Sequence, residues 1–202
     1  MTSTSNIPTT FGTPFMGGFY TGRFQIDGVE YALIVSPRDA ETLEGAIWGK
    51  YGHSVDGARS CNDGLANTTA MKDAGNKAAE WALQLNIAGY TDWYLPSRDE
   101  LELCYRNLKP TDDDNWASFR DGDNPSSLPT GYPYTDQSPQ QTSATDFQSG
   151  GSEAFAEDWY LTSTQYSPYG AWIQGFGDGG QYDGHKGYAR RARAVRRFKV
   201  TP

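Results

Sequence analysis

Helical periodicity is confined to two segments of the 202-residue chain, and this restricts the folds that the chain can adopt. Over residues 67–86, apolar side chains recur at intervals of three and four, as on one face of an amphipathic helix. In the second segment, Ser97 and Glu100 form the pattern of a capping box, and Pro110 ends the helix that follows. We therefore expect two long helices, which excludes a helical bundle.

A β-hairpin is predicted near the N-terminus. Asp27-Gly28 separates two runs in which apolar and polar residues alternate, and this dipeptide supplies the positive φ angles that a tight hairpin turn needs. We assign the hairpin to residues 19–35. The chain also contains 23 glycines and 11 prolines, which indicates many turns and long surface loops between a small number of strands.

The rest of the chain is predicted to form a long loop and a late group of strands. Residues 111–158 are polar and rich in proline, without periodicity, so we expect a long loop with a short helical turn near 142–148. Its expected packing anchors are aromatic: Trp116, Phe119, Tyr132 and Tyr134. Strand alternation returns over residues 159–200, with a Gly- and Asp-rich turn at 177–180 and a last strand over 190–200.

These segments predict one α+β domain over residues 19–200, preceded by an N-terminal arm over residues 1–18. The domain begins with a hairpin region (19–60) and two helices (61–110). A long loop insert (111–158) and C-terminal strands with ligand loops (159–200) follow. No internal repeat of solenoid or propeller length is present in the sequence.

Charge and hydropathy exclude several classes of partner. The formal net charge is -8, so the long-range field repels nucleic acid and anionic membranes, and we expect neither as a partner. No run of 18 apolar residues occurs, so we expect no segment to insert into a membrane. The first ten residues lack the basic and apolar regions of a secretory signal. The protein is therefore expected to stay in the cytoplasm where it is made, or to leave it by another route such as lysis.

No catalytic or cofactor motif stands out. The only histidines, His53 and His185, offer little for a catalytic triad or a zinc site, and no phosphate-binding loop is present. The 25 acidic residues offer many carboxylate pairs for glycoside hydrolysis, but none is singled out. The run that begins at Asp121 (Asp-Gly-Asp-Asn) resembles the start of a calcium loop, without the Glu that closes one. We expect no enzyme activity and no cofactor, with calcium in another geometry as the open alternative.

The basic run and the cysteines both have structural interpretations. Five arginines lie within eight positions near the C-terminus: Arg190, Arg191, Arg193, Arg196 and Arg197. In an acidic chain we expect them to pair with carboxylates across neighbouring strands or subunits, rather than to bind nucleic acid. Of the two cysteines, Cys104 lies on the apolar stripe of the second helix, where a buried free thiol is expected, and the state of Cys61 is open.

The candidate binding site is the aromatic and polar segment between residues 165 and 188. Aromatic rings lose little entropy on binding, and polar side chains beside Gly-rich turns can donate and accept hydrogen bonds with a glycan or a protein. Trp172 and Phe176, in the same segment, are expected in the core. The predicted ligand-binding residues are Tyr166, Tyr169, Gln174, Asp178, Gln181, Tyr182, Asp183, His185, Lys186 and Tyr188.

Four ordered pieces of the sequence resemble one known domain family. They begin at Trp93 (Trp-Tyr-Leu-Pro-Ser-Arg-Asp-Glu-Leu), Trp159 (Trp-Tyr-Leu-Thr-Ser-Thr), Ala171 (Ala-Trp-Ile-Gln-Gly-Phe) and Arg193 (Arg-Ala-Val-Arg-Arg-Phe). This order resembles the domain family at the C-terminus of the bacterial collagen-like adhesin Lcl, over residues 90–198. The chain departs from that family at Leu161-Thr162, where the family usually has Trp-Ser.

The resemblance implies a C-type-lectin-like fold, with two helices around small twisted antiparallel sheets, long irregular loops and a ligand face late in the chain. The same fold is similar to the tropism determinants of phages, whose late strand–loop segment binds the host receptor, and residues 165–188 hold the corresponding place. It is also similar to formylglycine-generating enzymes, but the reactive late cysteines of that group have no counterpart after Cys104.

The expected function is therefore that of a phage tail-fibre or tail-tip protein, located in the tail of the virion. It would recognise a host surface glycan or protein, contact other virion proteins and form a homo-oligomer, a trimer. The alternative is a structural virion component, such as a capsid decoration or tail adaptor protein, without a host ligand. A glycan-cleaving enzyme is a third hypothesis, which we do not favour.

Overall fold

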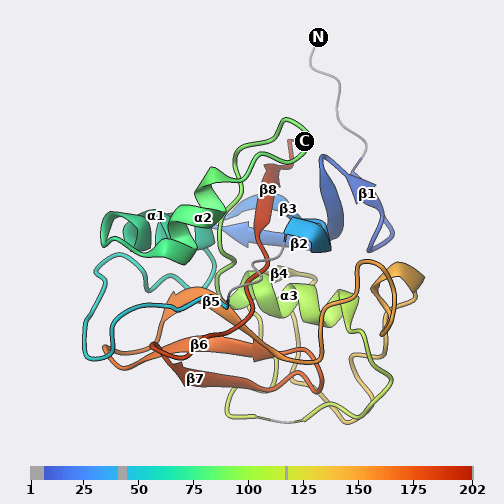
Figure 1. Cartoon of the computed structure of the whole chain (residues 1–202). Helices are drawn as coiled ribbons and strands as arrows, with labels where there is room; N and C mark the ends of the chain where they lie inside the picture. The colour runs from blue at the N-terminus through green and yellow to red at the C-terminus, as the bar shows by residue number, and fades with distance from the viewer. Residues whose placement is uncertain (1–6, 41–44, 117, 202) are drawn as a thin grey trace.

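A computed structural model describes residues 7–40, 45–116 and 118–201 of the chain (Figure 1). These residues form a mixed α+β structure with three α-helices and two antiparallel sheets, which confirms the predicted α+β class. The helices are α1 (Gly64–Asp73), α2 (Lys77–Gln84) and α3 (Arg98–Leu108).

The larger sheet brings the two ends of the chain together, because β8 near the C-terminus pairs with β3 of the N-terminal hairpin. Its strands in spatial order are β1 (Pro14–Phe15), β2 (Gly18–Ile26), β3 (Val29–Val35) and β8 (Val195–Lys199), and β4 (Ser127–Leu128) also pairs with β2. The smaller sheet consists of β5 (Trp159–Gln165), β6 (Gly170–Gly175) and β7 (Gln181–His185).

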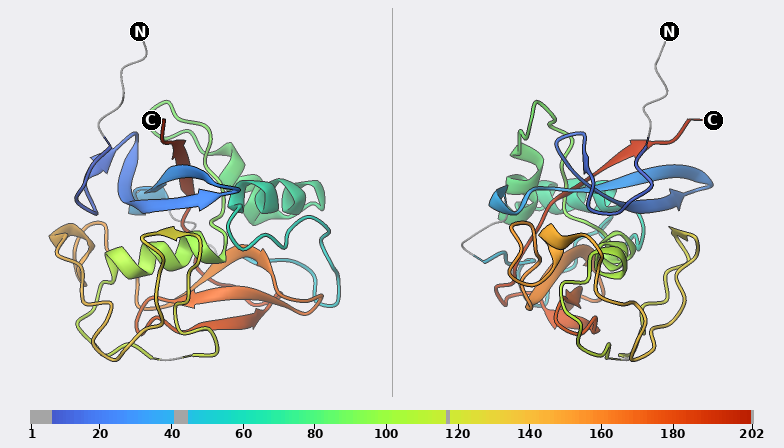
Figure 2. Two further views of the ribbon diagram at one scale, coloured as in Figure 1. Left: turned by 180° about the vertical axis from the view of Figure 1, so that it is seen from behind. Right: turned by 90° about the vertical axis from the view of Figure 1, so that its right-hand side faces the viewer.

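Helix α3 lies between the two sheets, as both views in Figure 2 show. It contacts β2 and β4 of the larger sheet, and β5 and β6 of the smaller one. The core cluster around α3 includes Leu33 from the larger sheet, Leu101 and Tyr105 from the helix, and Tyr160 from the smaller sheet. The predicted binding segment therefore lies on the side of α3 away from the N-terminal hairpin.

The first predicted helix is divided into two. Instead of one helix over residues 67–86, α1 ends before Gly75, whose φ of +80° is left-handed, and α2 starts after Asn76. The Asn76 side chain accepts a hydrogen bond of 2.8 Å from Ala79 N and so caps α2. A left-handed glycine followed by a capping residue ends one helix and starts the next, even though the apolar spacing continues across the break.

The second predicted helix is α3, and its capping box is confirmed. Ser97 Oγ accepts from Glu100 N at 3.4 Å, and Glu100 Oε2 accepts from Ser97 N at 2.7 Å. The helix ends at Leu108, and Lys109 is its C-cap. Pro110 follows, and a proline cannot donate the backbone hydrogen bond that would continue the helix. Cys104, on the buried face of this helix, is a fully buried free thiol, as predicted.

The predicted hairpin is confirmed as β2 and β3. Asp27 and Gly28 form the turn with φ angles of 49° and 77°, and Ile26 pairs with Val29 across it. The predicted N-terminal arm, as far as the structure describes it, contributes β1 and the first residue of β2 to the larger sheet. The last strand is shorter than the predicted 190–200, because only Val195–Lys199 pairs continuously with β3.

Replacing Gly28 by alanine is expected to lower the free energy of unfolding by about 1 kcal/mol, because a Cβ at φ +77° strains the backbone. No atom lies within 4 Å of the added Cβ, so the strain is not compounded by a clash. Urea denaturation checks the loss. Gly28→Asn is the matched control, since asparagine tolerates this conformation, and an equal loss for both substitutions would contradict the argument.

The long loop over residues 111–158 contains, in its described part, only β4 and a 3-10 turn at Thr145–Phe147, close to the predicted helical turn. Two of its four predicted aromatic anchors pack on the rest of the domain: Tyr134 is buried, and Phe119, although 54% exposed, stacks on Trp172 of the smaller sheet. The other two, Trp116 and Tyr132, are 61% and 74% exposed, which corrects their predicted role.

Buried polar side chains also hold this loop. The Asn115 side chain accepts a hydrogen bond of 2.7 Å from the Tyr105 hydroxyl and donates one of 2.9 Å to the Pro139 carbonyl. The Lys109 ammonium donates to the carbonyls of Asp113 and Pro139. These bonds satisfy loop carbonyls that regular structure leaves unpaired, so the loop is anchored through its backbone.

Four of the five C-terminal arginines pair with carboxylates of the same chain, as predicted. Arg190 is the exception among the described residues: it forms no ion pair there, and its guanidinium lies 5.8 Å from the centroid of the Tyr188 ring. Arg193 lies 2.9 Å from Glu153, and Arg196 lies 2.7 Å from Asp92. The other two pairs are Arg191–Asp158 at 3.3 Å and Arg197–Asp63 at 2.8 Å. The described part of the chain holds no helix long and apolar enough to cross a membrane.

Candidate ligand-binding surface

The smaller sheet and its connecting loops carry the predicted binding residues. Tyr166 and Tyr169 lie on the loop between β5 and β6, Asp178 lies in the turn between β6 and β7, and Tyr182 and Asp183 lie in β7. Six of the ten predicted residues reach the surface. Five of them are exposed and His185 is partly exposed; the exposed ones are Tyr166, Tyr169, Tyr182, Asp183 and Tyr188. Asp178 is partly exposed and binds Gly180 N at 3.0 Å through Oδ1.

Gln174 and Gln181 do not reach the surface, which corrects their predicted exposure. They are directly opposite in the β6–β7 register, and Gln181 Nε2 donates to Gln174 Oε1 at 2.7 Å. Gln174 Nε2 donates in turn to the carbonyl of Gly179 at 2.8 Å. The two amides satisfy each other in the interior because their strand positions face the core, with exposures of 0% and 1%.

Lys186 is also buried, which corrects its predicted exposure. Its side chain is 0% exposed, although it directly follows β7 and lies between the partly exposed His185 and the exposed Gly187. Its ammonium donates to the His53 carbonyl at 2.8 Å and to Gln165 Oε1 at 2.6 Å. It therefore binds a segment that is more than 130 positions away in the sequence, which no local pattern indicates.

A ring stack forms the first part of the exposed surface; we call it the tyrosine–histidine stack (Tyr51, Tyr169, His185 and Tyr188). The His185 ring lies between Tyr51, at a centroid distance of 4.3 Å and an angle of 9°, and Tyr188, at 4.4 Å and 20°. Tyr169 packs against Tyr51 at 4.9 Å. The three tyrosines are 52%, 55% and 58% exposed, so large ring faces and edges remain open to solvent.

Tyr51 is the member of this stack that the sequence did not indicate. It lies on the loop over residues 49–55, within a polar and Gly-containing stretch that has no strand or helix pattern. Hydrogen bonds hold the loop against the smaller sheet: Gly52 N donates to the Pro168 carbonyl at 3.0 Å, and Val55 N to Gln165 Oε1 at 2.8 Å. These contacts are long-range, so only the folded chain brings Tyr51 beside His185.

A second ring group lies on the same sheet; we call it the tryptophan group (Phe119, Tyr166, Trp172 and Tyr182). Phe119 stacks on Trp172 at 4.9 Å and 22°, and Tyr166 meets Trp172 edge-on at 5.5 Å. The Arg98 guanidinium also lies 5.0 Å from the Trp172 ring centroid. Trp172 is consequently only 8% exposed, and with Phe176 at 0% it confirms the core assignment of both rings.

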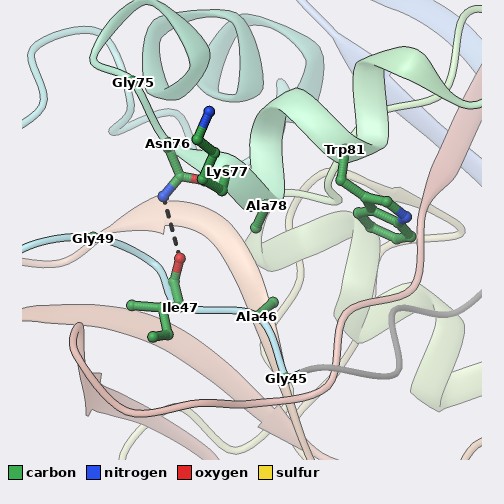
Figure 3. A pocket seen from close by; sticks show the side chains of 9 residues that line it. All are labelled: Gly45, Ala46, Ile47, Gly49, Gly75, Asn76, Lys77, Ala78 and Trp81. Carbon is green, nitrogen blue, oxygen red and sulfur yellow. Dashed lines mark hydrogen bonds between the residues drawn. The ribbon is translucent and has the colours of Figure 1, made fainter.

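A hollow of about 460 Å³ lies away from these rings, between residues 45–49 and the start of α2 (Figure 3). Ala46, Ala78 and Trp81 supply apolar wall, and Asn76 Nδ2 donates to the Ile47 carbonyl at 3.2 Å across one end. Nothing in the sequence indicated this hollow, because its walls come from an irregular segment and the break between two helices.

The described residues contain no group of three or more His, Cys, Asp or Glu side chains that could hold a metal ion. The run that resembles a calcium loop has a structural use instead, because Asn124 is buried and its Nδ2 donates to the Asp99 carbonyl at 2.8 Å. Both cysteines are free thiols, and burial raises the pKa of Cys104 to about 12, which makes it a poor nucleophile.

The smaller sheet and its adjoining loops thus carry two groups of packed aromatic rings, together with the exposed carboxylate of Asp183 and the partly exposed carboxylate of Asp178. No protein-family model matches the chain, and no match was found among curated proteins.

Proposed function

We propose that this chain is a receptor-binding protein of a phage tail fibre or tail tip, built on a C-type-lectin-like fold. In this proposal the tyrosine–histidine stack and the tryptophan group together recognise a glycan or a protein on the host surface. The observation that carries the proposal is the tyrosine–histidine stack, because it holds three half-exposed tyrosine rings in fixed positions on separate loops.

Rings held in this way suit recognition for a physical reason. Each ring is already immobilised by its neighbours, so little side-chain entropy is lost when a ligand binds. Ring faces stack on the apolar faces of sugar rings or on side chains, and the exposed Asp183 beside them can accept hydrogen bonds. Such binding is weak at one site, and several copies in a homotrimer on a virion would multiply it.

The lectin-like part of the proposal is supported by the arrangement of the elements. A small antiparallel sheet late in the chain lies on one side of α3, and strands from near both ends of the chain pair in a separate sheet on the other side. This agrees with the resemblance of residues 90–198 to the C-terminal domain family of the adhesin Lcl. The virion location rests on the similarity to the tropism determinants of phages, and the trimer is expected because tail fibres are generally trimers.

Replacing Tyr51 and Tyr188 together by alanine is expected to weaken binding to intact host cells by about 30-fold or more, since each ring covers His185. The measurement is the binding of fluorescently labelled protein to host cells and to cells of an unrelated species. The matched control replaces Trp116 and Tyr132, which are two exposed rings on the long loop. This control is expected to bind like the parent protein.

Unchanged binding of the Tyr51/Tyr188 variant would remove the stack from the proposal. A parent protein that binds no cells but is incorporated into particles would favour the alternative of a structural virion component. Urea denaturation of each variant separates a binding defect from a folding defect.

A further inference from the structure

Lys186 is a buried cation whose charge no carboxylate balances. Its side chain is 0% exposed, and none of the ion pairs in the described residues includes it. Its two hydrogen-bond acceptors, the His53 carbonyl and Gln165 Oε1, are both neutral. Its ammonium also lies 4.1 Å from the centroid of the Trp48 ring, which stabilises the charge without neutralising it. A buried cation of this kind normally acquires a counter-charge.

The same spot has more hydrogen-bond donors than acceptors. Gln165 Oε1 accepts from both Lys186 Nζ and Val55 N, which fixes the orientation of the amide. Gln165 Nε2 is therefore a donor, and it is buried with no partner. The indole N–H of Trp48 is a second buried donor without a partner. Both side chains are 3% exposed, so bulk water does not satisfy these donors.

The local potential is positive as well. Burial, together with the positive charge of Arg59, lowers the pKa of Lys186 to about 8, so the ammonium is still mostly charged at neutral pH. No acidic group contributes to this pKa, although the chain as a whole carries a net charge of -8. Donors without acceptors around an unbalanced cation form the environment that binds an anion.

A hollow of about 370 Å³ adjoins this spot through the residues that they share. It shares Trp48, His53 and Val55 with the surroundings of Lys186, and Lys50 adds a second basic side chain to its wall. None of the described residues that line it is Asp or Glu. An anion that enters the hollow therefore meets no repelling carboxylate among these residues.

We propose that the side chains of Lys186, Gln165 and Trp48 form a binding site for one compact monovalent anion, either a halide or a carboxylate group. The carboxylate can belong to a free ion or to an acidic sugar whose ring occupies the hollow. The bound anion accepts hydrogen bonds from Lys186 Nζ, Gln165 Nε2 and Trp48 Nε1. The site lies behind the loop that carries Tyr51, and the proposal does not rest on the receptor-binding function.

The test compares thermal unfolding of the parent protein and Lys186→Met as sodium bromide or sodium acetate is added. At an anion concentration 100-fold above Kd, the parent Tm is expected to exceed its anion-free value by about 5–10 °C and to level off. Lys186→Met is expected to show only the general salt effect. A second set of measurements compares the Tm in glucuronate with the Tm in glucose. A higher Tm in glucuronate but not in glucose identifies an acidic sugar as a ligand.

Gln165→Glu keeps the test decisive if Lys186→Met does not fold. The new carboxylate retains the acceptor for Val55 N and Lys186 and replaces the unpartnered Nε2 by an anionic oxygen. We expect a higher Tm than that of the parent protein and no further response to bromide. In crystals of the parent protein soaked in bromide, an anomalous peak is expected beside Lys186 and Gln165. The proposal is overturned if the parent protein and Lys186→Met respond equally to bromide, acetate and glucuronate and the crystals show no such peak. In that case the unpartnered donors bind water.

Discussion

Phe176→Ala is expected to lower the free energy of unfolding by about 3–5 kcal/mol, the largest effect of any single substitution that we consider. Phe176 is 0% exposed and directly follows β6. Its ring stacks on Phe155 at a centroid distance of 3.9 Å and 15°, and it meets Tyr160 edge-on at 4.9 Å. Tyr105 of α3 packs against it at 5.6 Å, so this one ring joins the smaller sheet to the central helix.

Alanine at this position removes the ring and leaves a cavity that stacked aromatic neighbours cannot easily fill. Urea denaturation, with the m-value checked for two-state behaviour, measures the loss. The matched control is Trp116→Ala, because Trp116 is 61% exposed and its loss is expected to stay within about 0.5 kcal/mol. A loss below about 1 kcal/mol for Phe176→Ala would show that the smaller sheet does not depend on this contact.

Glu100 is expected to make the stability of the protein depend on pH around neutrality. The carboxyl is fully buried at the start of α3, where it accepts from Ser97 N, from Gly64 N at 3.0 Å and from the Tyr94 hydroxyl at 2.6 Å. Burial outweighs these hydrogen bonds and raises the pKa of Glu100 from 4.5 to about 7. The folded protein therefore binds a proton at this carboxyl more tightly than the unfolded chain does.

This difference in proton affinity sets the direction in which the free energy of unfolding changes with pH. The stabilisation from the Glu100 proton is fully present below about pH 4.5 and is lost as the pH rises through about 7. The difference between these pKa values corresponds to about 3 kcal/mol, an upper bound because the buried carboxylate relaxes with its surroundings. Glu102 is also buried and its pKa is also raised by burial, so it adds to the trend in the same direction.

Glu100→Gln tests this contribution, since the amide has nearly the same shape and cannot ionise. Between pH 5 and pH 8, the variant is expected to lose less of its free energy of unfolding than the parent protein, by about 2–3 kcal/mol. The matched control is Glu80→Gln, whose carboxylate lies on the exposed side of α2 beside Lys77. Parallel pH curves for the parent protein and Glu100→Gln would refute the assignment to Glu100.

Local signals in the sequence determined the elements that need no distant partner. Asp27-Gly28 supplies its own positive φ angles, so the hairpin was predictable from the dipeptide and its flanking alternation. Ser97 and Glu100 satisfy each other's backbone N–H groups within one turn, so the start of α3 was predictable as well. The break between α1 and α2 also had a local signal, the dipeptide Gly75-Asn76. The prediction missed it because the apolar spacing continues across the break.

The tertiary structure alone decided which late polar and aromatic residues reach the surface. The sequence determined the fold class and that rings concentrate between residues 165 and 188. It did not determine that Gln174 and Gln181 satisfy each other inside the sheet, or that Lys186 turns inward to bind the loop that carries Tyr51. The reason is physical: local spacing sets backbone conformation, whereas burial of a polar side chain depends on a partner that only long-range packing supplies.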